Sequence, residues 1–526
     1  MLGRVKSGAL KGVDAYLVDV EVDLAPGLPG FATVGLPETA VKESIFRVKP
    51  ALKNSGYKFP GKRITINLAP ADVRKEGTGF DLPVALGILT AQGIVPQDSL
   101  EKFLIFGELS LDGRLKPTWG VLSVALATRE AGLALVIPSE NASEAAVVQG
   151  IDIYAAERLS QVVEFLAGRE ALTPVAPEKL DLERLPAVYE ADFQEVRGQE
   201  AAKRALLIAA AGAHNVLMAG PPGAGKTMLA RCLPSILPPL SFDEALETSK
   251  VYSILGRLKP GKPLVTERPF RNPHHTISDA GLIGGGTTPR PGEVSLAHHG
   301  VLFLDELPEF KRSTLEVLRQ PLEEGRVTIS RALTSLTYPG RVMLVAAMNP
   351  CPCGYYGDAK RACRCTPNQI SSYRGRISGP LLDRIDIQIQ VPAVPFRDLT
   401  GAAEGEGSAE MRARVLRARE VQNRRFGRSR IHANAHMNSR LVKQHCALGL
   451  EAQRLLEMAM ERLGLSARAY HRILKIARTI ADLEAEPQIA PAHLAEAIQY
   501  RTLDRQFGSE PGVMFAKEVA EEYLIR

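Results

Sequence analysis

The chain has 526 residues, of which 45% are apolar and 24% charged, an ordinary globular composition that accommodates roughly three domains. The net charge of +6 is too small for a global basic field, so nucleic-acid binding would have to come from local patches. The N-terminus lacks the apolar core of a signal peptide, no run approaches a membrane span, and the six cysteines are not spaced as a secreted disulfide framework. We therefore expect a soluble, cytoplasmic protein without a membrane partner.

Several parts follow one another along the chain. Residues 1–168 alternate strand-like and helix-like segments, and 169–190 are rich in Pro, Glu and Leu without periodicity, which predicts a linker. Residues 191–395 hold most of the motifs described below. After a glycine-rich joint or surface loop at 401–408 the pattern is almost entirely helical, so residues 396–526 are predicted to form a helical C-terminal domain.

Three segments stand out in the first part: FGELSLDGR at 106–114, PTWG at 117–120 and VIPSEN at 136–141. Together they resemble the proteolytic domain of the Lon proteases. The resemblance covers about residues 1–168 and implies an α+β, S5-like fold for this part of the chain.

The catalytic pair of the Lon proteases does not carry over to this sequence. In that family a Lys-Asp-Gly-Pro-Ser-Ala-Gly segment holds the nucleophilic serine, whereas the matching stretch 75–81 places Gly79 there. The catalytic lysine, which follows a Gly-Gly pair, is replaced by Leu122. A Ser–Lys dyad needs both partners within hydrogen-bond reach. We expect a scaffold or ring-stabilising module without protease activity, with Thr78 and Ser123 as weaker candidates for a substitute nucleophile.

A phosphate-binding loop is predicted at residues 220–227. An apolar run at 216–218 precedes it and a helix is expected from Thr227 to Leu233. The loop consists of Gly220, Pro221, Pro222, Gly223, Ala224, Gly225, Lys226 and Thr227. Glycines let backbone N–H groups point at phosphates, Lys226 can reach the β/γ oxygens, and Thr227 can hold Mg²⁺. The sequence therefore predicts binding of ATP and Mg²⁺.

A second motif is the apolar run 301–304, which is followed directly by Asp305 and Glu306. A buried parallel strand delivers its last residues to the same sheet edge as the phosphate loop. There Asp305 can order the Mg²⁺ hydration shell and Glu306 can polarise the attacking water; the alternative is a strand that ends in two solvated acids. A third apolar run, 342–348, ends at Asn349, which could position that water or be a turn residue.

The order of these motifs resembles the AAA+ ATPases, over about residues 191–500. The stretch GPLLDRID at 379–386 is similar to the arginine-finger segment of the magnesium-chelatase and MCM branch. The resemblance implies that Arg384 reaches the γ-phosphate of the adjacent subunit and that Arg468, at a helix start, is the sensor-2 arginine of the lid. Arg472 is the less favoured candidate for sensor 2, and surface ion pairs are the alternative for these arginines. An arginine donated between subunits implies a homo-oligomeric ring, a hexamer by resemblance.

Two elements between the phosphate loop and Asn349 could contact a substrate. The glycine-rich residues 279–292 are expected to form an exposed mobile loop, because such a run packs poorly. In the magnesium-chelatase branch a helix-2 insertion that points into the ring lies here. Residues 327–338 are strand-like on both sides of Arg331 and resemble the pre-sensor-1 hairpin, which tracks the nucleic-acid backbone in ring helicases. Arg290 and Arg331 are therefore candidates for DNA contact, with a solvated hairpin arginine as the alternative for Arg331.

A strongly basic block lies at residues 412–430, with only Glu420 opposing it. Phosphate binding and a solvated helical face are both compatible with this block. Its members are Arg412, Arg414, Arg417, Arg419, Arg424, Arg425, Arg428 and Arg430.

Two closely spaced cysteine pairs lie in an insertion at 351–365, just after Asn349. They are Cys351, Cys353, Cys363 and Cys365. Four thiols around a turn-rich loop can close on one tetrahedral Zn²⁺, which would be structural because no coordination position is left open. Thiol–disulfide chemistry and free thiols are the alternatives.

Across essentially the whole chain this combination resembles the YifB/ComM family, most specifically at 270–276 (FRNPHHT) and 304–310 (LDELPEF). The expected fold is α/β: an AAA+ P-loop NTPase core with a helical lid, preceded by the α+β Lon-protease-like domain. ComM-type members of this family are ring helicases that drive branch migration of recombination intermediates in natural transformation. The resemblance therefore implies single-stranded or branched DNA as the partner. For the histidine pairs His274–His275 and His298–His299 we expect structural hydrogen-bonding roles, with metal binding as the alternative, because adjacent histidines of a strand point to opposite sides. The rival functions are the ATPase subunit of a metal chelatase and a protein-remodelling ATPase.

Overall fold

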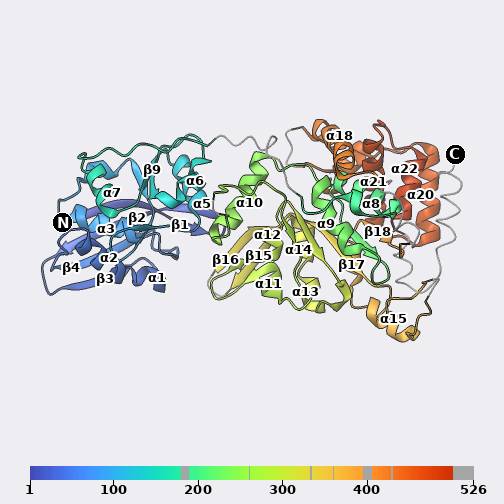
Figure 1. The fold of residues 1–526 in the computed structure, drawn as a ribbon, viewed down its shortest axis with the longest axis horizontal. Helices are drawn as coiled ribbons and strands as arrows, with labels where there is room; N and C mark the ends of the chain where they lie inside the picture. Colours follow the sequence, from blue (N-terminus) through green and yellow to red (C-terminus); the bar gives the residue numbers. More distant parts are fainter. Residues whose placement is uncertain are drawn as a thin grey trace. The chain divides into compact units, whose positions relative to one another are not determined.

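The computed structural model describes residues 1–178, 189–259, 261–331, 334–358, 361–394, 405–427 and 431–501. Much of the predicted linker, half of the glycine-rich joint, Arg428, Arg430 and the chain beyond residue 501 therefore lie outside the described residues. The chain divides into two compact units (Figure 1). The first contains Met1–Leu185, Ser241–Thr266 and Ser330–Tyr338, and the second contains the remainder of the chain.

The first unit is built on a seven-stranded mixed sheet with the order β3-β4-β2-β1-β5-β8-β9. Strand β2 pairs antiparallel with β1 and β4, and the other pairs are parallel. The strands are β1 (Leu2–Lys11), β2 (Asp14–Ala25), β3 (Gly30–Val34), β4 (Arg63–Ala69), β5 (Phe103–Ile105), β8 (Ala134–Pro138) and β9 (Ile153–Ala156). A small antiparallel pair, β6 (Glu108–Leu109) and β7 (Leu115–Lys116), lies outside this sheet.

Helices of the first unit supply the other half of its core. The central helix α3 is buried along its whole length, and the strands β1 and β2 lie next to it. The helices are α1 (Thr39–Lys42), α2 (Ser44–Asn54), α3 (Asp81–Ala91), α4 (Gln97–Leu100), α5 (Val121–Glu130), α6 (Ala142–Ala146) and α7 (Leu159–Leu166). Alternating sheet and helix segments thus form the α+β arrangement expected for residues 1–168.

Helix α10 (Phe242–Ile254) belongs to the first unit although it follows the phosphate loop in sequence. It begins with a capping box, in which Ser241 and Glu244 satisfy each other's backbone N–H groups. The helix packs against α5, and the Gly120 amide donates to the Ser253 carbonyl at 3.1 Å. Chain order alone assigns this segment to residues 191–395, so its packing is a finding of the tertiary structure.

The second unit contains a five-stranded parallel sheet with the order β11-β14-β17-β10-β18. Its strands are β10 (Val216–Ala219), β11 (Phe270–Arg271), β14 (Val301–Leu304), β17 (Met343–Met348) and β18 (Ile387–Gln390). All residues of β10, β14 and β17 are buried, as expected for parallel strands covered on both faces. The carboxyl ends of these three strands therefore meet at one edge.

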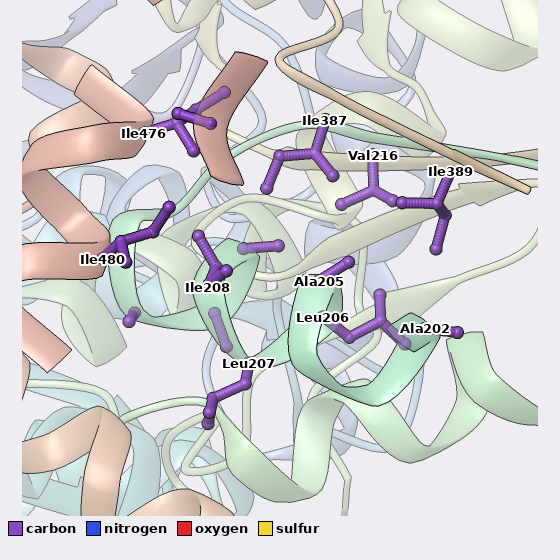
Figure 2. Packing of buried hydrophobic residues seen from close by; sticks show 14 of the residues in the cluster. Ala202, Ala205, Leu206, Leu207, Ile208, Val216, Ile387, Ile389, Ile476 and Ile480 are labelled. Carbon is purple, nitrogen blue, oxygen red and sulfur yellow. The ribbon is translucent and has the colours of Figure 1, made fainter. Parts of the chain in front are cut away.

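The sheet of the second unit is covered by α8 (Glu200–Gly212) and α9 (Lys226–Ile236). Figure 2 shows how α8 connects the sheet with the C-terminal helices. Ile208 of α8 lies between Val216 of β10 on one side and Ile480 of α21 on the other (Figure 2). One apolar core thus joins the sheet to the C-terminal helices.

The C-terminal domain is helical over its described part, as predicted. Its helices are α18 (Ser408–Phe426), α19 (Ser439–His445), α20 (Leu450–Leu463), α21 (Ala467–Leu483) and α22 (Pro491–Gln499). Ser466 caps α21 by accepting a hydrogen bond from the Ala469 amide at 3.2 Å. The apolar face of α21 consists of Ile473, Ile476, Ala477, Ile480 and Leu483, and it is buried except at Leu483, which is partly exposed. Over the described ranges, no helix combines the length and apolarity that a bilayer span requires.

The glycine-rich segment 279–292 corrects an expectation. Only its tip is an exposed turn, at residues 286–287: α11 (Asp279–Ile283) leads into a small antiparallel pair, β12 (Gly284–Gly285) with β13 (Arg290–Pro291). A Cβ on Gly292 would lie 2.5 Å from the Gly284 amide nitrogen, so backbone presses directly on backbone. Glycine is used here for close approach rather than for mobility.

The predicted hairpin is present as β15 (Arg326–Arg331) and β16 (Thr334–Pro339), which form a two-stranded sheet. Its residues Ser330–Tyr338 belong to the first unit, and the rest of it belongs to the second. The remaining short helices are α12 (Glu293–Leu296), α13 (Arg312–Glu316), α14 (Arg319–Glu324), α15 (Pro367–Arg374) and α16 (Gly379–Leu382).

Candidate active site

The phosphate loop connects β10 to α9, which begins at Lys226 rather than at the predicted Thr227 and continues to Ile236. Its backbone depends on glycine: Gly223 and Gly225 have φ of +77° and +83°. A Cβ on Gly220 would lie 2.1 Å from the Val391 carbonyl oxygen. A loop of this shape leaves N–H groups at a helix N-terminus directed at a bound phosphate.

Lys226 is the cation of this loop and is only 8% exposed. Its Nζ donates to the carbonyls of Gly220 at 2.7 Å and Pro221 at 2.9 Å, and to Oδ1 of Asn349 at 3.2 Å. Burial lowers the pKa of Lys226, whereas the nearby Asp305 and Glu306 carboxylates act in the opposite direction. The ammonium is therefore held where β10 and β17 both end, within reach of an anion at the loop.

Thr227 and Asp305 meet as the sequence predicts. The Thr227 hydroxyl donates to Oδ2 of Asp305 at 2.7 Å, and Asp305 directly follows β14. A hydroxyl and a carboxylate beside a phosphate loop are the oxygen ligands that Mg²⁺ prefers. These two residues fit a magnesium ion held between protein and phosphates.

Glu306 stands at the same sheet edge in an unusual conformation, with φ of +52°. Its amide donates to Oδ1 of Asp305 at 2.9 Å, and its side chain is 55% exposed. Oε2 of Glu306 lies 3.4 Å from Nδ1 of His275, a residue for which no link to the carboxylates was expected. One feature of the sequence could have indicated this contact. His275 comes shortly after β11, and β11 pairs in parallel with β14, the strand that Glu306 follows.

Arg384 and Arg468 are each paired with a carboxylate of their own chain rather than with the loop 220–227. Arg384 is 5% exposed; its guanidinium pairs with Glu323 of α14 and donates to the Pro380 carbonyl. Burial lowers the pKa of Arg384, and Glu323 partly offsets that effect. Arg468 is 64% exposed and lies 3.9 Å from Asp383, the residue next to Arg384.

A buried polar cluster joins the C-terminal helices to the sheet near Arg384. His214 is fully buried; its Nε2 lies 2.8 Å from the Thr479 hydroxyl and its Nδ1 3.5 Å from Asp386. Burial lowers the pKa of His214, against the opposing effect of Asp386. Burial also acts to raise the pKa of Asp386, but the charge of Arg472 and the hydrogen bond from His214 hold it well below its usual range. Arg472 therefore forms an ion pair with Asp386 within this cluster.

The candidate DNA contacts Arg290 and Arg331 are both exposed, Arg290 in β13 and Arg331 at the end of β15. The basic block falls largely on α18, where it is divided between two roles. Arg419 donates to the carbonyls of His432 and Ala210, and Arg425 donates to Asp482 at 2.7 Å, so these two arginines are structural.

Other arginines of α18 face outward to different degrees. Arg414 pairs with Glu406 at 3.0 Å, and the guanidinium of Arg412 lies 5.7 Å from the ring centroid of Tyr189. Arg417 and Arg424 are exposed. The charge available to a partner is therefore smaller than the sequence count suggests.

All four cysteines of the insertion come together. Their sulfur atoms lie within 4.8 Å of one another, as a common metal ion requires. Cys351 is fully buried and the other three are partly exposed. The remaining cysteines, Cys232 and Cys446, are buried elsewhere.

The first unit has no room for a serine at the position where a Lon protease carries its nucleophile. A Cβ on Gly79 would lie 2.2 Å from the ring of Phe106. The Leu122 side chain is buried, and the Ser123 hydroxyl donates to the Val13 carbonyl at 2.6 Å. The Thr78 hydroxyl is bound to the Glu108 carboxylate.

Family descriptions match three stretches of the chain. "Magnesium chelatase, subunit ChlI" matches residues 192–399, "Subunit ChlI of Mg-chelatase" matches 20–141, and "Magnesium chelatase, subunit ChlI C-terminal" matches 405–501. The AAA+ class of the core expected from the motifs is thereby confirmed.

Individual relatives span nearly the whole chain. "Competence protein ComM" of Haemophilus influenzae is 48% identical over 507 residues, 96% of this chain and 98% of the relative. "Uncharacterized protein YifB" of Escherichia coli is 44% identical over 505 residues, with the same two coverages of 96% and 98%. "Lon protease 2" of Bacillus subtilis is 31% identical over 157 residues, 27% of each chain.

Proposed function

The chain belongs to the YifB/ComM family of magnesium-chelatase-like proteins, and we propose that it is an ATP-dependent DNA motor. One observation carries the ATPase part: three strand ends bring Lys226, the Thr227–Asp305 pair and Asn349 to one edge. The cofactors of the proposal are ATP with Mg²⁺ and a structural Zn²⁺ at the four cysteines of the insertion.

In the proposed reaction, the oxygen of a water molecule attacks the γ-phosphorus of ATP, and the bond to the β–γ bridging oxygen breaks. Lys226 and the loop amides would hold the phosphates, and Thr227 and Asp305 would hold Mg²⁺, which would supply positive charge to offset that of the phosphates. Glu306 accepts the proton of the attacking water, and Asn349 orients that water. ADP and inorganic phosphate are the products.

Arg384 is proposed to act on the neighbouring subunit, where it neutralises charge on the γ-phosphate, with Arg468 acting from the lid on its own subunit. In the free chain the Arg384 guanidinium is bound to Glu323. A site completed by a neighbour requires an oligomer, and a closed ring completes every site; we propose that this ring is a homohexamer in the cytoplasm.

DNA is the proposed substrate, in single-stranded or branched form, and branch migration of recombination or transformation intermediates is the proposed task. Support comes from the exposed Arg331 and Arg290, from the exposed Arg417 and Arg424 of α18, and from the relative named as a competence protein. The first unit is proposed to stabilise the ring without proteolysis, because Phe106 occupies the nucleophile position.

The test is the steady-state ATPase rate without DNA and with single-stranded DNA, duplex or a four-way junction. Glu306→Gln is the blank, because loss of the proton acceptor should lower turnover by roughly 10²–10⁴. We expect single-stranded or branched DNA to stimulate the wild-type rate, with an effect that fades as salt rises. If no DNA changes the rate and Glu306→Gln is inactive, the ATPase activity stands. The DNA motor is then rejected in favour of a chelatase or a protein substrate.

A further inference from the structure

The sulfur atoms of the cysteine insertion have the spacing of a tetrahedral thiolate site. Cys351 and Cys353 are 3.4 Å apart, and Cys363 lies 3.7 Å from Cys351 and 3.6 Å from Cys353. A disulfide would bring two sulfurs to about 2 Å. Zn–S bonds of about 2.3 Å place the sulfurs of a tetrahedron about 3.8 Å apart. These three separations match the edges of that tetrahedron and not a disulfide, and the Cys365 sulfur lies within 4.8 Å of the other three.

Local backbone geometry supports the same site. The Cys365 amide donates to the Cys363 sulfur at 3.4 Å, the kind of contact that orients and stabilises a metal thiolate. Cys351 is fully buried, so one corner of the tetrahedron is anchored in the second unit. The insertion is also tied to α15: the Arg374 Nε donates to the Pro350 carbonyl at 3.1 Å, and its guanidinium lies 5.0 Å from the Tyr356 ring centroid.

The insertion touches the phosphate loop at a glycine. Gly354 has φ of +86°, and a Cβ built there would lie 2.5 Å from Cδ and 3.0 Å from Cγ of Pro222. The Gly354 amide in turn donates to the Cys351 carbonyl at 2.9 Å, which places this contact within one turn of the first cysteine. The backbone of the cysteine loop thus lies directly against the phosphate loop.

A second connection runs through the chain itself. Asn349, whose Oδ1 accepts from Lys226 at 3.2 Å, is separated from Cys351 by Pro350 alone. The Gly220 amide donates to the Met348 carbonyl at 3.1 Å, one residue before Asn349. The first metal ligand is therefore two residues from a side chain that holds the phosphate-loop lysine.

We propose that the Zn²⁺-bound cysteine loop supports the nucleotide site, holding Pro222 through Gly354 and Asn349 through Cys351, so that nucleotide affinity depends on the metal. The proposal rests on the nucleotide-binding part of the proposed function and adds the zinc-bound loop as a support of that site. With the four thiolates joined, the loop is rigid and the phosphate loop rests on it. Without the metal, nothing closes the two cysteine pairs, and both contacts loosen.

The metal is tested by elemental analysis of the purified full-length chain. We expect about one zinc per chain, lost in Cys353→Ser and in Cys365→Ser, each of which removes one of four ligands. Cys446→Ser is the control, because that cysteine lies outside the cluster and should leave the zinc content unchanged. Absence of zinc from the wild-type chain, or its retention in both ligand variants, overturns the site.

The connection to the nucleotide is tested with two matched glycines of the same loop. Gly354→Ala and Gly357→Ala impose similar backbone strain, since φ is +86° at one and +79° at the other. A Cβ on Gly357 has no atom within 4 Å, whereas one on Gly354 meets Pro222. We expect Gly354→Ala to weaken binding of a fluorescent ATP analogue about tenfold with zinc retained, and Gly357→Ala to change neither.

Equal affinities for the two glycine variants overturn the connection, even if zinc is present. Chelation of zinc from the wild-type chain provides a further measurement: affinity should fall and recover when zinc is restored. A chain that holds zinc but does not bind the analogue rejects the proposed ATPase instead, so the two failures are distinguishable.

Discussion

Replacing Arg384 with alanine tests the proposed ring mechanism directly. In the free chain this arginine is 5% exposed and pairs with Glu323, whose side chain is 53% exposed. Because Glu323 can be rehydrated, loss of the pair should change the free energy of unfolding by no more than about 1 kcal/mol. The Pro380 carbonyl also loses its Arg384 donor, which adds a cost of about 1 kcal/mol, whereas the buried Nε has no hydrogen-bond partner to lose. Arg384→Ala should therefore fold.

The effect on turnover should be much larger than the effect on stability. Loss of an arginine that neutralises the γ-phosphate in the transition state should lower kcat by roughly 10³, or about 4 kcal/mol of barrier. Lys226, Thr227 and Asp305 are untouched, so affinity for nucleotide should stay near the wild-type value. The assay is steady-state ATP hydrolysis on chains whose assembly is verified by light scattering, beside a binding titration.

Mixing two inactive variants separates action on the neighbour from action in the same chain. Glu306→Gln keeps the arginine but lacks the base, and Arg384→Ala keeps the base but lacks the arginine. In rings mixed at equal amounts, about a quarter of the sites combine an intact base with a neighbour's intact arginine. Partial recovery of hydrolysis is expected.

Unchanged turnover in assembled Arg384→Ala would remove this arginine from the mechanism. A large loss of turnover without recovery in verified mixed rings would leave it in the mechanism but reject action on the neighbour. Loss of assembly in the variant would instead assign Arg384 to the subunit contact.

Two further predictions concern other parts of the chain. Burial keeps the His214 pKa below its ordinary value near 6.5, so below that pH the unfolded chain binds a proton that the folded chain does not. The free energy of unfolding should therefore fall on acidification from pH 7 to 5, by up to about 1.4 kcal/mol per pH unit. Urea titrations measure this slope, and an equal slope in His214→Gln would show that His214 does not cause it. Gly79→Ser with Leu122→Lys should not cleave casein, because any Cβ introduced at position 79 would collide with the Phe106 ring at 2.2 Å. Cleavage by that double variant, absent from a Leu122→Lys control, would show that the domain can still accommodate the dyad.

Much of the second unit could be predicted from the sequence because its information is local. Parallel strands buried on both faces appear as continuous apolar runs, and the residues that end them must meet at one sheet edge. The convergence of Lys226, Asp305 and Asn349 follows from that rule alone. The cap at Ser466 is local in another way, because it joins residues only three apart in the chain. The four cysteines lie close together in sequence, so their convergence could likewise be anticipated.

The same local reasoning missed the helix and the strand pair in the glycine-rich segment 279–292, of which only the tip is an exposed turn. Glycine permits both mobility and close backbone approach. Which of the two applies depends on the backbone that packs against the glycine in the folded chain. The basic block shows the same limitation. A count of arginines cannot distinguish Arg425, which binds the buried Asp482, from the exposed Arg417.

The residues of the proposed nucleotide site could be located from the sequence, because such a site requires particular residue types at short spacings. Only the tertiary structure decided what depends on distant partners: that α10 packs in the first unit, that Phe106 fills the place of a serine, and that His275 lies beside Glu306. It also decided that Gly354 rests on Pro222, which lies 132 residues earlier in the chain. Such contacts follow from how elements pack, which no periodicity or motif spacing encodes.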